Sequence, residues 1–282
     1  MTYGEWYRTY LDLYKRDLAP KTRESYDRVA ALIGPELDGL QLDQITPDDV
    51  QRALLAVSDA AGTRQGQIAF ALVHAVLRRA ERSRRLQWNP ADALDKPRHD
   101  ARPGRSINVT DWATLRPLID DDVALAVLAY AGLRRGELLA LRWGDLGPDV
   151  VRVRLQRVRI GGKMVEQPPK SAAGVRDVPV LPDLRRVLDR EPLHLSRALV
   201  CPVAPETLAH RWRRAQELAG IAQPYRLHDL RHTYATRLVA AGCDLRVLQY
   251  MLGHSSFDLT AGTYTHVDGS LARQTCLRLP LH

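Results

Sequence analysis

Apolar residues recur at helical spacing along the first hundred residues, with polar residues between them. One helix start is clear, because Thr46 can cap it, Pro47 can take its first position and two acidic residues follow. The preceding pattern stops at Gly34-Pro35, where we expect a helix to end. The sequence predicts helices over residues 3–16, 21–33, 47–57 and 64–86.

The pattern changes after residue 90. Residues 94–110 mix proline, glycine and charged residues with almost no apolar periodicity, which is typical of an exposed linker between domains. A new helix is expected next, with Thr110 or Asp111 as its N-cap. A strongly apolar helical stretch over residues 122–143 follows, and Gly132 interrupts it.

Residues 150–160 alternate apolar and basic side chains, so the sequence predicts a strand there. Two glycines at 161–162 can turn the chain, residues 163–167 can return, and residues 175–180 form a third short strand. Helical patterns then resume. The fold class is therefore mainly α with a small antiparallel β-sheet (α+β). We expect a helical domain over residues 1–93, a linker over 94–110, and a mixed domain with a C-terminal tail over 111–282.

Charge is distributed unevenly along the chain. The 282 residues carry a net charge of +8, and residues 101–282 hold all of this excess, because basic and acidic residues balance in the first hundred. Only five of the 41 basic residues are lysine. Arginine forks suit bidentate recognition of phosphate, so a polyanionic partner is one interpretation and a solvated basic surface is the other.

Several classes of protein are disfavoured. Cys201, Cys243 and Cys276 are an odd, widely spaced set, which argues against a disulfide framework and a cysteine-based zinc site. No apolar run approaches the length of a membrane span, and the N-terminus lacks the apolar segment of a signal peptide. We expect a cytoplasmic protein without a membrane partner.

Candidate chemistry lies in the second half of the chain. Arg134 follows the glycine break and has Glu137 three residues on, and Lys170 precedes a tight Ala-Ala-Gly turn. In HDLRH, His228 and Arg231 leave one face of a helix with Cβ atoms roughly 5–6 Å apart. Each of these residues alone has an ordinary structural explanation, such as a salt-bridged arginine or a solvated turn lysine.

Further candidates follow in the last thirty residues. His254 comes just after Gly253, the glycine that should end the last clear helix, and Tyr264 follows ten residues later in TYTHV. His232 and Tyr234 are expected to be structural, packed beside the other candidates.

At the end of the fourth predicted helix, an arginine cluster is either a solvated face or a contact to a phosphate backbone. Its members are Arg78, Arg79, Arg82 and Arg85.

Taken in order, AGLRRGEL, PKSAAGVRDVPV, HDLRH, LGHSS and TYTHV resemble the motifs of the tyrosine recombinase (phage integrase) family. The motifs cover residues 105–270, and residues 1–95 resemble that family's helical core-DNA-binding domain. The resemblance implies a catalytic set with Glu137 in support. That set is Arg134, Lys170, His228, Arg231, His254 and Tyr264.

The resemblance also implies a role for each residue. Arg134 and Arg231 clamp the scissile phosphate, while His228 and His254 donate to it or handle protons. Lys170 protonates the leaving 5′ oxygen, and Tyr264 is the nucleophile that forms a 3′-phosphotyrosyl ester.

Elementary chemistry agrees with these roles. The phosphodiester transition state is dianionic, and cationic donors stabilise it. Tyrosine has a pKa near 10, so it needs a base or a strongly cationic setting to attack at neutral pH.

The family resemblance implies double-stranded DNA as substrate, a homo-tetramer on paired sites, and no metal or other cofactor. A directionality or host accessory factor is compatible with it. Integration or excision of a mobile element is the first interpretation, and Xer-type dimer resolution is the alternative. A type IB topoisomerase, a DNA-binding accessory protein without catalysis and a metal-dependent nuclease are the remaining alternatives.

Overall fold

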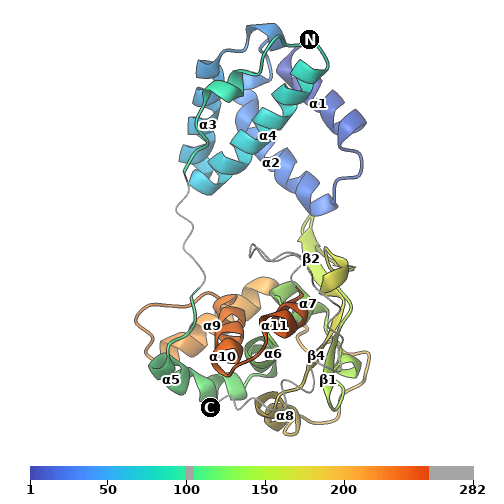
Figure 1. The fold of residues 1–282 in the computed structure, drawn as a ribbon, viewed down its shortest axis with the longest axis vertical. Helices are drawn as coiled ribbons and strands as arrows, with labels where there is room; N and C mark the ends of the chain where they lie inside the picture. The colour runs from blue at the N-terminus through green and yellow to red at the C-terminus, as the bar shows by residue number, and fades with distance from the viewer. Residues whose placement is uncertain (99–104, 254–282) are drawn as a thin grey trace. The chain divides into compact units, whose positions relative to one another are not determined.

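The computed structural model describes residues 1–98 and 105–253. The chain divides into two compact units (Figure 1). The first contains residues 1–102 together with 159–163, and the second contains residues 103–158 and the chain from residue 164 onward.

The first unit is helical and has a core of its own. Its helices are α1 (Tyr3–Tyr14), α2 (Pro20–Leu37), α3 (Pro47–Ala61) and α4 (Thr63–Arg82), with 3₁₀ turns at Leu42–Gln44 and Pro90–Ala93. Helices α2, α3 and α4 pack against one another, and α1 packs on α4. Trp6 of α1 is buried, and its indole N–H donates to the carbonyl of Val76 at 3.0 Å.

Two expectations for this unit have different outcomes. The predicted start of α3 is confirmed, because the Thr46 hydroxyl accepts from the Asp49 N–H and the Asp49 carboxylate accepts from the Thr46 N–H. The predicted end of α2 at Gly34-Pro35 is wrong, since the helix continues to Leu37. Leu37 is fully buried, and its burial offsets the one backbone hydrogen bond that Pro35 cannot donate.

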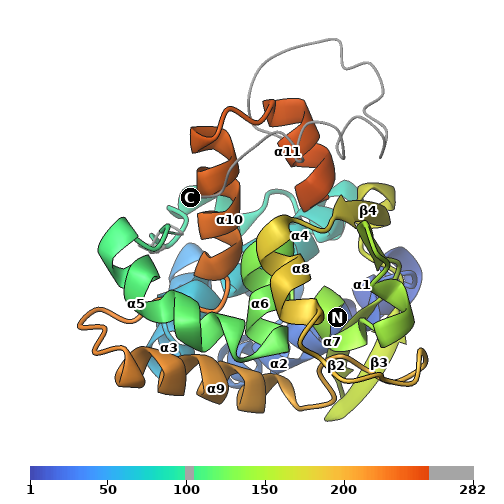
Figure 2. The same ribbon diagram turned by 90° about the horizontal axis from the view of Figure 1, so that it is seen from below.

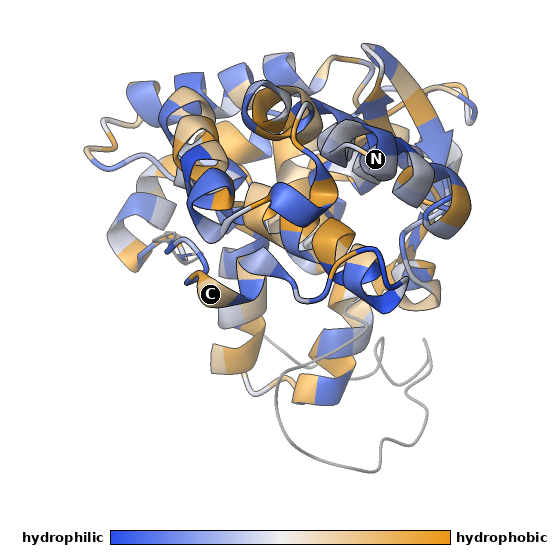
Figure 3. Ribbon diagram, turned by 90° about the horizontal axis from the view of Figure 1, so that it is seen from above, coloured by the Kyte–Doolittle hydropathy of each residue, from blue (hydrophilic) through white to orange (hydrophobic). Residues whose placement is uncertain are grey.

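The second unit is built around an apolar helix, α6 (Val123–Ala131). Helices α5 (Val109–Asp120), α8 (Pro182–Leu188) and α10 (Asp229–Ala240) all pack on α6 (Figure 2). The other helices of this unit are α7 (Arg135–Ala140), α9 (Pro205–Leu218) and α11 (Leu245–Leu252), with 3₁₀ turns at Trp143–Asp145 and Ala172–Gly174. Hydrophilic and hydrophobic residues alternate along the helices in view in Figure 3, whereas α6 consists of apolar residues alone.

The strands form two small antiparallel pairs, not one sheet. β1 (Val150–Val153) pairs with β4 (Arg176–Pro179), and β2 (Gln156–Ile160) pairs with β3 (Lys163–Gln167). The expectation of one continuous strand over residues 150–160 is therefore wrong. The chain leaves the first pair at Arg154, whose guanidinium donates to the carbonyls of Val153 and Arg176, and enters the second pair two residues later.

The N-cap expected for α5 is also wrong. The cap is Asn108, whose side-chain oxygen accepts from the Asp111 N–H at 2.8 Å, so the helix begins earlier than Thr110 or Asp111 would allow. The predicted fold class is confirmed, since the described residues are mainly helical with short antiparallel strands. None of the described helices has both the length and the apolar character that crossing a bilayer requires.

Candidate active site

The break between α6 and α7 brings Arg134 to the site. Gly132 ends α6 in the left-handed region with φ of 61°, and a Cβ there would lie 2.3 Å from the ring of Tyr234. Only glycine fits both requirements. The turn places Arg134 at the N-cap position of α7, where its N–H and guanidinium both donate to Glu137 at 2.8 Å. Arg134 Nη2 also donates to the carbonyl of Gly253 at 2.8 Å.

Glu137 is a buried carboxylate shared by two arginines. Glu137 is 2% exposed, and Arg176 donates to both of its carboxylate oxygens at 3.0 and 2.9 Å. Burial alone raises the pKa of the Glu137 carboxyl, but the hydrogen bonds and charges of Arg176 and Arg134 outweigh burial and hold this pKa below its usual range. Glu137 is therefore ionised at neutral pH and orients both guanidinium groups.

Helix α10 supplies Arg231. Arg231 is 3% exposed, and its Nη1 donates to the Gly132 carbonyl at 2.6 Å while its Nη2 donates to the carbonyl of Leu252. Burial and the neighbouring charges of Arg134 and Arg176 lower the pKa of Arg231 to about 9. Three guanidinium groups thus lie close enough to repel one another.

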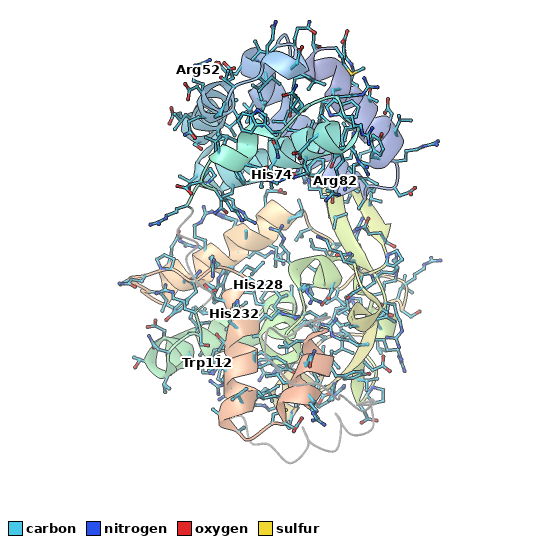
Figure 4. The ribbon with its side chains drawn as sticks, turned by 45° about the horizontal axis from the view of Figure 1, so that its top comes forward. Arg52, His74, Arg82, Trp112, His228 and His232 are labelled. Atoms are coloured by element: carbon cyan, nitrogen blue, oxygen red, sulfur yellow. The ribbon has the colours of Figure 1, made fainter. Side chains whose placement is uncertain are left out.

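His228 occupies the N-cap position of α10, one turn before Arg231. Its ring meets that of His232 edge-on, with centroids 5.0 Å apart, and the two residues lie side by side on α10 in Figure 4. Partial burial and the charges of His232, Arg231 and Arg134 lower the pKa of His228 to about 4. His228 is nevertheless exposed, so a neutral imidazole faces solvent beside Arg134 and Arg231.

Lys170 is exposed on the connection between β3 and β4. These strands belong to different pairs, so Lys170 does not lie on a hairpin. The same connection continues into the 3₁₀ turn Ala172–Gly174, whose last carbonyl accepts from Arg176 Nη1 at 3.0 Å. The connection that carries Lys170 is in this way bonded to Arg176.

His254 and Tyr264 lie outside the described residues, as do the C-terminal tail and residues 99–104 of the expected linker. Gly253 is described, and it ends α11 in the left-handed region with φ of 63°, as the sequence predicted. Its carbonyl, held by Arg134, immediately precedes His254.

The structure therefore brings together Arg134, Glu137, His228 and Arg231, which the sequence singled out in separate motifs. Sequence analysis missed Arg176, the fully buried arginine at the first position of β4. A basic residue opening a short apolar strand was the available signal, since such a side chain must find an acidic partner if it is buried. The expected structural placement of Tyr234 fits its 1% exposure.

The arginine cluster of the first unit has a mixed arrangement. Arg78 donates to both carboxylate oxygens of Asp92 at 2.7 Å. Arg79 and Arg85 lie over aromatic rings of α1, at 4.1 and 5.2 Å from the ring centroids. Arg82, labelled in Figure 4, is exposed at the end of α4. All four remain candidates for DNA contact, and Arg82 and Arg85 are the two that are exposed.

No metal-binding group is apparent in the described part of the chain. Residues 1–98 and 105–253 contain no cluster of three or more histidine, cysteine, aspartate or glutamate side chains that could hold a metal ion. The positive charge of the site comes from guanidinium groups instead.

Comparison with known proteins agrees with this geometry. Residues 116–270 match the model of the phage integrase family, and residues 2–55 match the SAM-like N-terminal domain of phage integrases. The chain belongs to the phage integrase family. Curated relatives include tyrosine recombinase XerC 2 of Ralstonia nicotianae, which is 34% identical over 208 residues, 66% of this chain and 56% of the relative. A putative prophage phiRv2 integrase of Mycobacterium tuberculosis is 28% identical over 276 residues, 90% of this chain and 72% of the relative.

Solved structures share the integrase fold. The Tn1549 transposon integrase in complex with transposon right-end DNA superposes with a TM-score of 0.75 at 21% identity, covering 97% of this chain and 98% of that one. The chain spans 56% of the length of the Ralstonia relative and 45% of the length of a XerC-like tyrosine recombinase from Caldanaerobacter subterraneus.

Proposed function

We propose that this integrase-family protein is a site-specific DNA recombinase that cleaves and rejoins DNA through a 3′-phosphotyrosyl intermediate. The observation that carries the proposal is the charge imbalance of the site. Arg134, Arg176 and Arg231 crowd together, and only the first two bond to the Glu137 carboxylate. An anion with several oxygens would relieve this repulsion, and a DNA phosphodiester is such an anion.

The proposed roles follow from the donors that each side chain can offer. A guanidinium carries five N–H donors, and the bonds of Arg134 to Glu137 and Gly253 use two of them. Arg134 can therefore be held in place by the protein and still present donors to a non-bridging phosphate oxygen. Arg231 is anchored by two backbone carbonyls, those of Gly132 and Leu252.

His228 suits proton transfer because its lowered pKa keeps the imidazole neutral at physiological pH. We assign it the proton of the Tyr264 hydroxyl as the Tyr264 oxygen attacks phosphorus. The P–O5′ bond then breaks, and the Lys170 ammonium gives its proton to the departing 5′ oxygen. His254, next to the carbonyl that Arg134 holds, would donate a further hydrogen bond to the phosphate.

The reverse reaction joins a 5′-hydroxyl from another strand to the same phosphorus. Because the phosphotyrosyl ester conserves the energy of the broken bond, strand exchange needs no ATP. The arginine forks supply the charge that a metal ion would otherwise supply, so we propose a metal-independent reaction.

Double-stranded DNA carrying specific sites is the proposed partner, and a tetramer on paired sites is the proposed assembly. Solved structures of lambda integrase include a dimer bound to a core site and a tetramer bound to a Holliday junction. Integration or excision of a mobile element is the first biological role, given the match to a prophage integrase over 90% of this chain. Matches to XerC proteins favour dimer resolution as the second candidate.

Covalent capture tests the proposal. Wild type, Tyr264→Phe and Tyr250→Phe are incubated in EDTA with fragmented element and host DNA, quenched with denaturant, and the protein-linked DNA is sequenced. Tyr250 lies partly buried on α11 and serves as the matched control. Adducts from wild type and Tyr250→Phe but not from Tyr264→Phe, clustered at a few sites, would support the proposal.

Other outcomes have separate meanings. Adducts without site preference would indicate a topoisomerase-like activity. DNA binding without any adduct would indicate an accessory protein, and cleavage that EDTA abolishes would indicate a metal-dependent nuclease. Adduct sites at the ends of a mobile element would indicate integration or excision. Adduct sites at a chromosomal or plasmid locus would indicate dimer resolution.

A further inference from the structure

Arg176 lies where three segments of the second unit meet. Its side chain has no exposed surface, and all its recorded hydrogen bonds go to groups in those segments. It donates to Glu137 of α7 through both terminal nitrogens, to the Met251 carbonyl of α11 at 2.6 Å, and to the Gly174 carbonyl at 3.0 Å. A single guanidinium therefore ties α7, the end of α11 and the turn that follows Lys170.

The contacts continue from Arg176 to Arg134 through one carboxylate. Glu137 Oε1 accepts from Arg176 Nη1 and from Arg134 Nη1, and Glu137 Oε2 accepts from Arg176 Nη2 and from the Arg134 N–H. Arg176 thus holds both carboxylate oxygens of Glu137 in place, and the same two oxygens orient Arg134. Loss of the bidentate geometry would let the carboxylate rotate, and Arg134 would move with it.

Close packing around Gly253 adds a second connection. A Cβ at Gly253 would lie 2.8 Å from the Ala173 carbonyl oxygen and 3.0 Å from Arg176 Nη1. The turn after Lys170, the Arg176 guanidinium and the residue before His254 are therefore in contact, with no room for a side chain between them. Arg176 thus contacts the segments that carry two of the proposed catalytic groups, Arg134 and Lys170.

We infer that Arg176 is a positioning residue for DNA cleavage, acting through Glu137 on Arg134. The inference rests on the proposed recombinase function. Arg176 is too deeply buried and too fully engaged to contact DNA itself, so its effect must appear in the geometry of the other groups. Lysine at this position keeps the charge but offers one point donor in place of a planar fork.

The alternative is that Arg176 serves folding alone, as a buried ion pair. Breaking such a pair destabilises a protein strongly, so loss of activity by itself would not distinguish the two roles. Coupling to Arg134 does distinguish them. If Arg176 acts through Arg134, the effect of Arg176→Lys should largely disappear when Arg134 has already been replaced.

The test uses the full chain and a duplex carrying a site recovered by covalent capture. Wild type, Arg176→Lys, Arg134→Lys and the double variant are compared by adduct formation rate at saturating DNA, DNA affinity in a gel-shift assay, and thermal unfolding. Arg185→Lys is the matched control, because Arg185 also binds two carbonyls, those of Gly147 and Pro148. Glu137→Asp, alone and with Arg134→Lys, provides a second route to the same displacement.

We expect Arg176→Lys to slow adduct formation roughly 10²-fold, the loss typical of a reacting group displaced by about 1 Å, with DNA affinity nearly unchanged. The double variant should be little slower than Arg134→Lys, and Arg185→Lys should match wild type. Losses that multiply in the double variant, or a wild-type rate for Arg176→Lys, would overturn the inference.

Two further outcomes are also decisive. If Arg176→Lys fails to fold, the Glu137→Asp pair decides, since non-additivity with Arg134→Lys supports positioning and additivity excludes it. If wild type forms no adduct on any DNA, the proposed function fails, and the inference about Arg176 falls with it.

Discussion

Arg231 Nη1 donates to the carbonyl of Gly132 at 2.6 Å, across 99 residues of sequence. This bond joins the N-terminal half of α10 to the end of α6, and α10 also carries His228. The glycine that lets the chain turn toward Arg134 thus also supplies an acceptor for the other proposed phosphate-binding arginine. Local backbone geometry at Gly132 therefore controls two groups of the site together.

Gly132→Ala should destabilise the second unit and displace both arginines. A non-glycine residue with φ of 61° is strained by about 1 kcal/mol, and the added Cβ would meet the buried Tyr234 ring, for a total loss of roughly 2–4 kcal/mol. Urea unfolding measures this loss. Gly220→Ala is the control, because Gly220 has φ of 66° with nothing within 4 Å of its added Cβ. Equal losses at the two positions would contradict the role of Tyr234 packing.

The stability of the DNA-free protein should fall as pH decreases through the histidine range, and His228 should contribute to this fall. The folded-state pKa of His228 is about 4 against an unfolded value of 6.5, so the unfolded chain binds more protons between these values. The contribution of the neutral imidazole is fully present above pH 6.5 and is lost as pH falls toward 4.

Urea midpoints at pH 7.5, 5.5 and 4.5 measure this dependence. His228→Gln should show a smaller fall than wild type, whereas His210→Gln, an exposed residue on α9, should keep the wild-type slope. Identical slopes for wild type and His228→Gln would mean that the folded and unfolded pKa values of His228 agree.

Signals carried by a few neighbouring residues were predicted correctly from the sequence. Thr46 and Asp49 form the cap of α3, and Gly253 ends α11, because these residues act on the backbone beside them. The glycine break at Gly132 was also predicted, since the chain must leave helical geometry where a left-handed residue follows an apolar run.

Features that depend on distant packing were not predicted. Pro35 suggested a helix end, but burial of Leu37 carries the helix past it. The alternation over residues 150–160 is continuous, yet the partner strands β4 and β3 divide it into two. Arg176 escaped notice because its importance comes from Glu137, 39 residues away. The same limit applies to the meeting of Arg134 with Arg231, which the family resemblance suggested and periodicity alone did not.

The chain entering the second unit is bonded to α10, and this attachment should contribute to stability. The Ile107 N–H donates to the buried Thr233 hydroxyl at 2.8 Å, and that hydroxyl donates to the Asp229 carbonyl at 2.8 Å. Thr233→Val would leave the Ile107 N–H without its acceptor and should destabilise by about 1–3 kcal/mol in urea unfolding. Thr236→Val is the control, because its hydroxyl bonds to Ser106 in an exposed position and should matter much less.

Sulfate should stabilise the DNA-free protein if the arginines around Glu137 bind a tetrahedral anion. Arg134, Arg176 and Arg231 carry three positive charges against the single charge of Glu137, so anion binding to the folded state should raise the melting temperature. A rise of roughly 2–4 °C over sodium chloride at equal ionic strength corresponds to about 1 kcal/mol for a unit of this size.

Arg134→Gln should reduce this difference, while Arg185→Gln should preserve it, because Arg185 binds carbonyls of Gly147 and Pro148 instead. Sulfate also stabilises proteins by exclusion from their surface, and that contribution is the same in both variants. A sulfate effect that Arg134→Gln leaves intact would place the bound anion elsewhere and would remove the charge argument for a phosphate at this site.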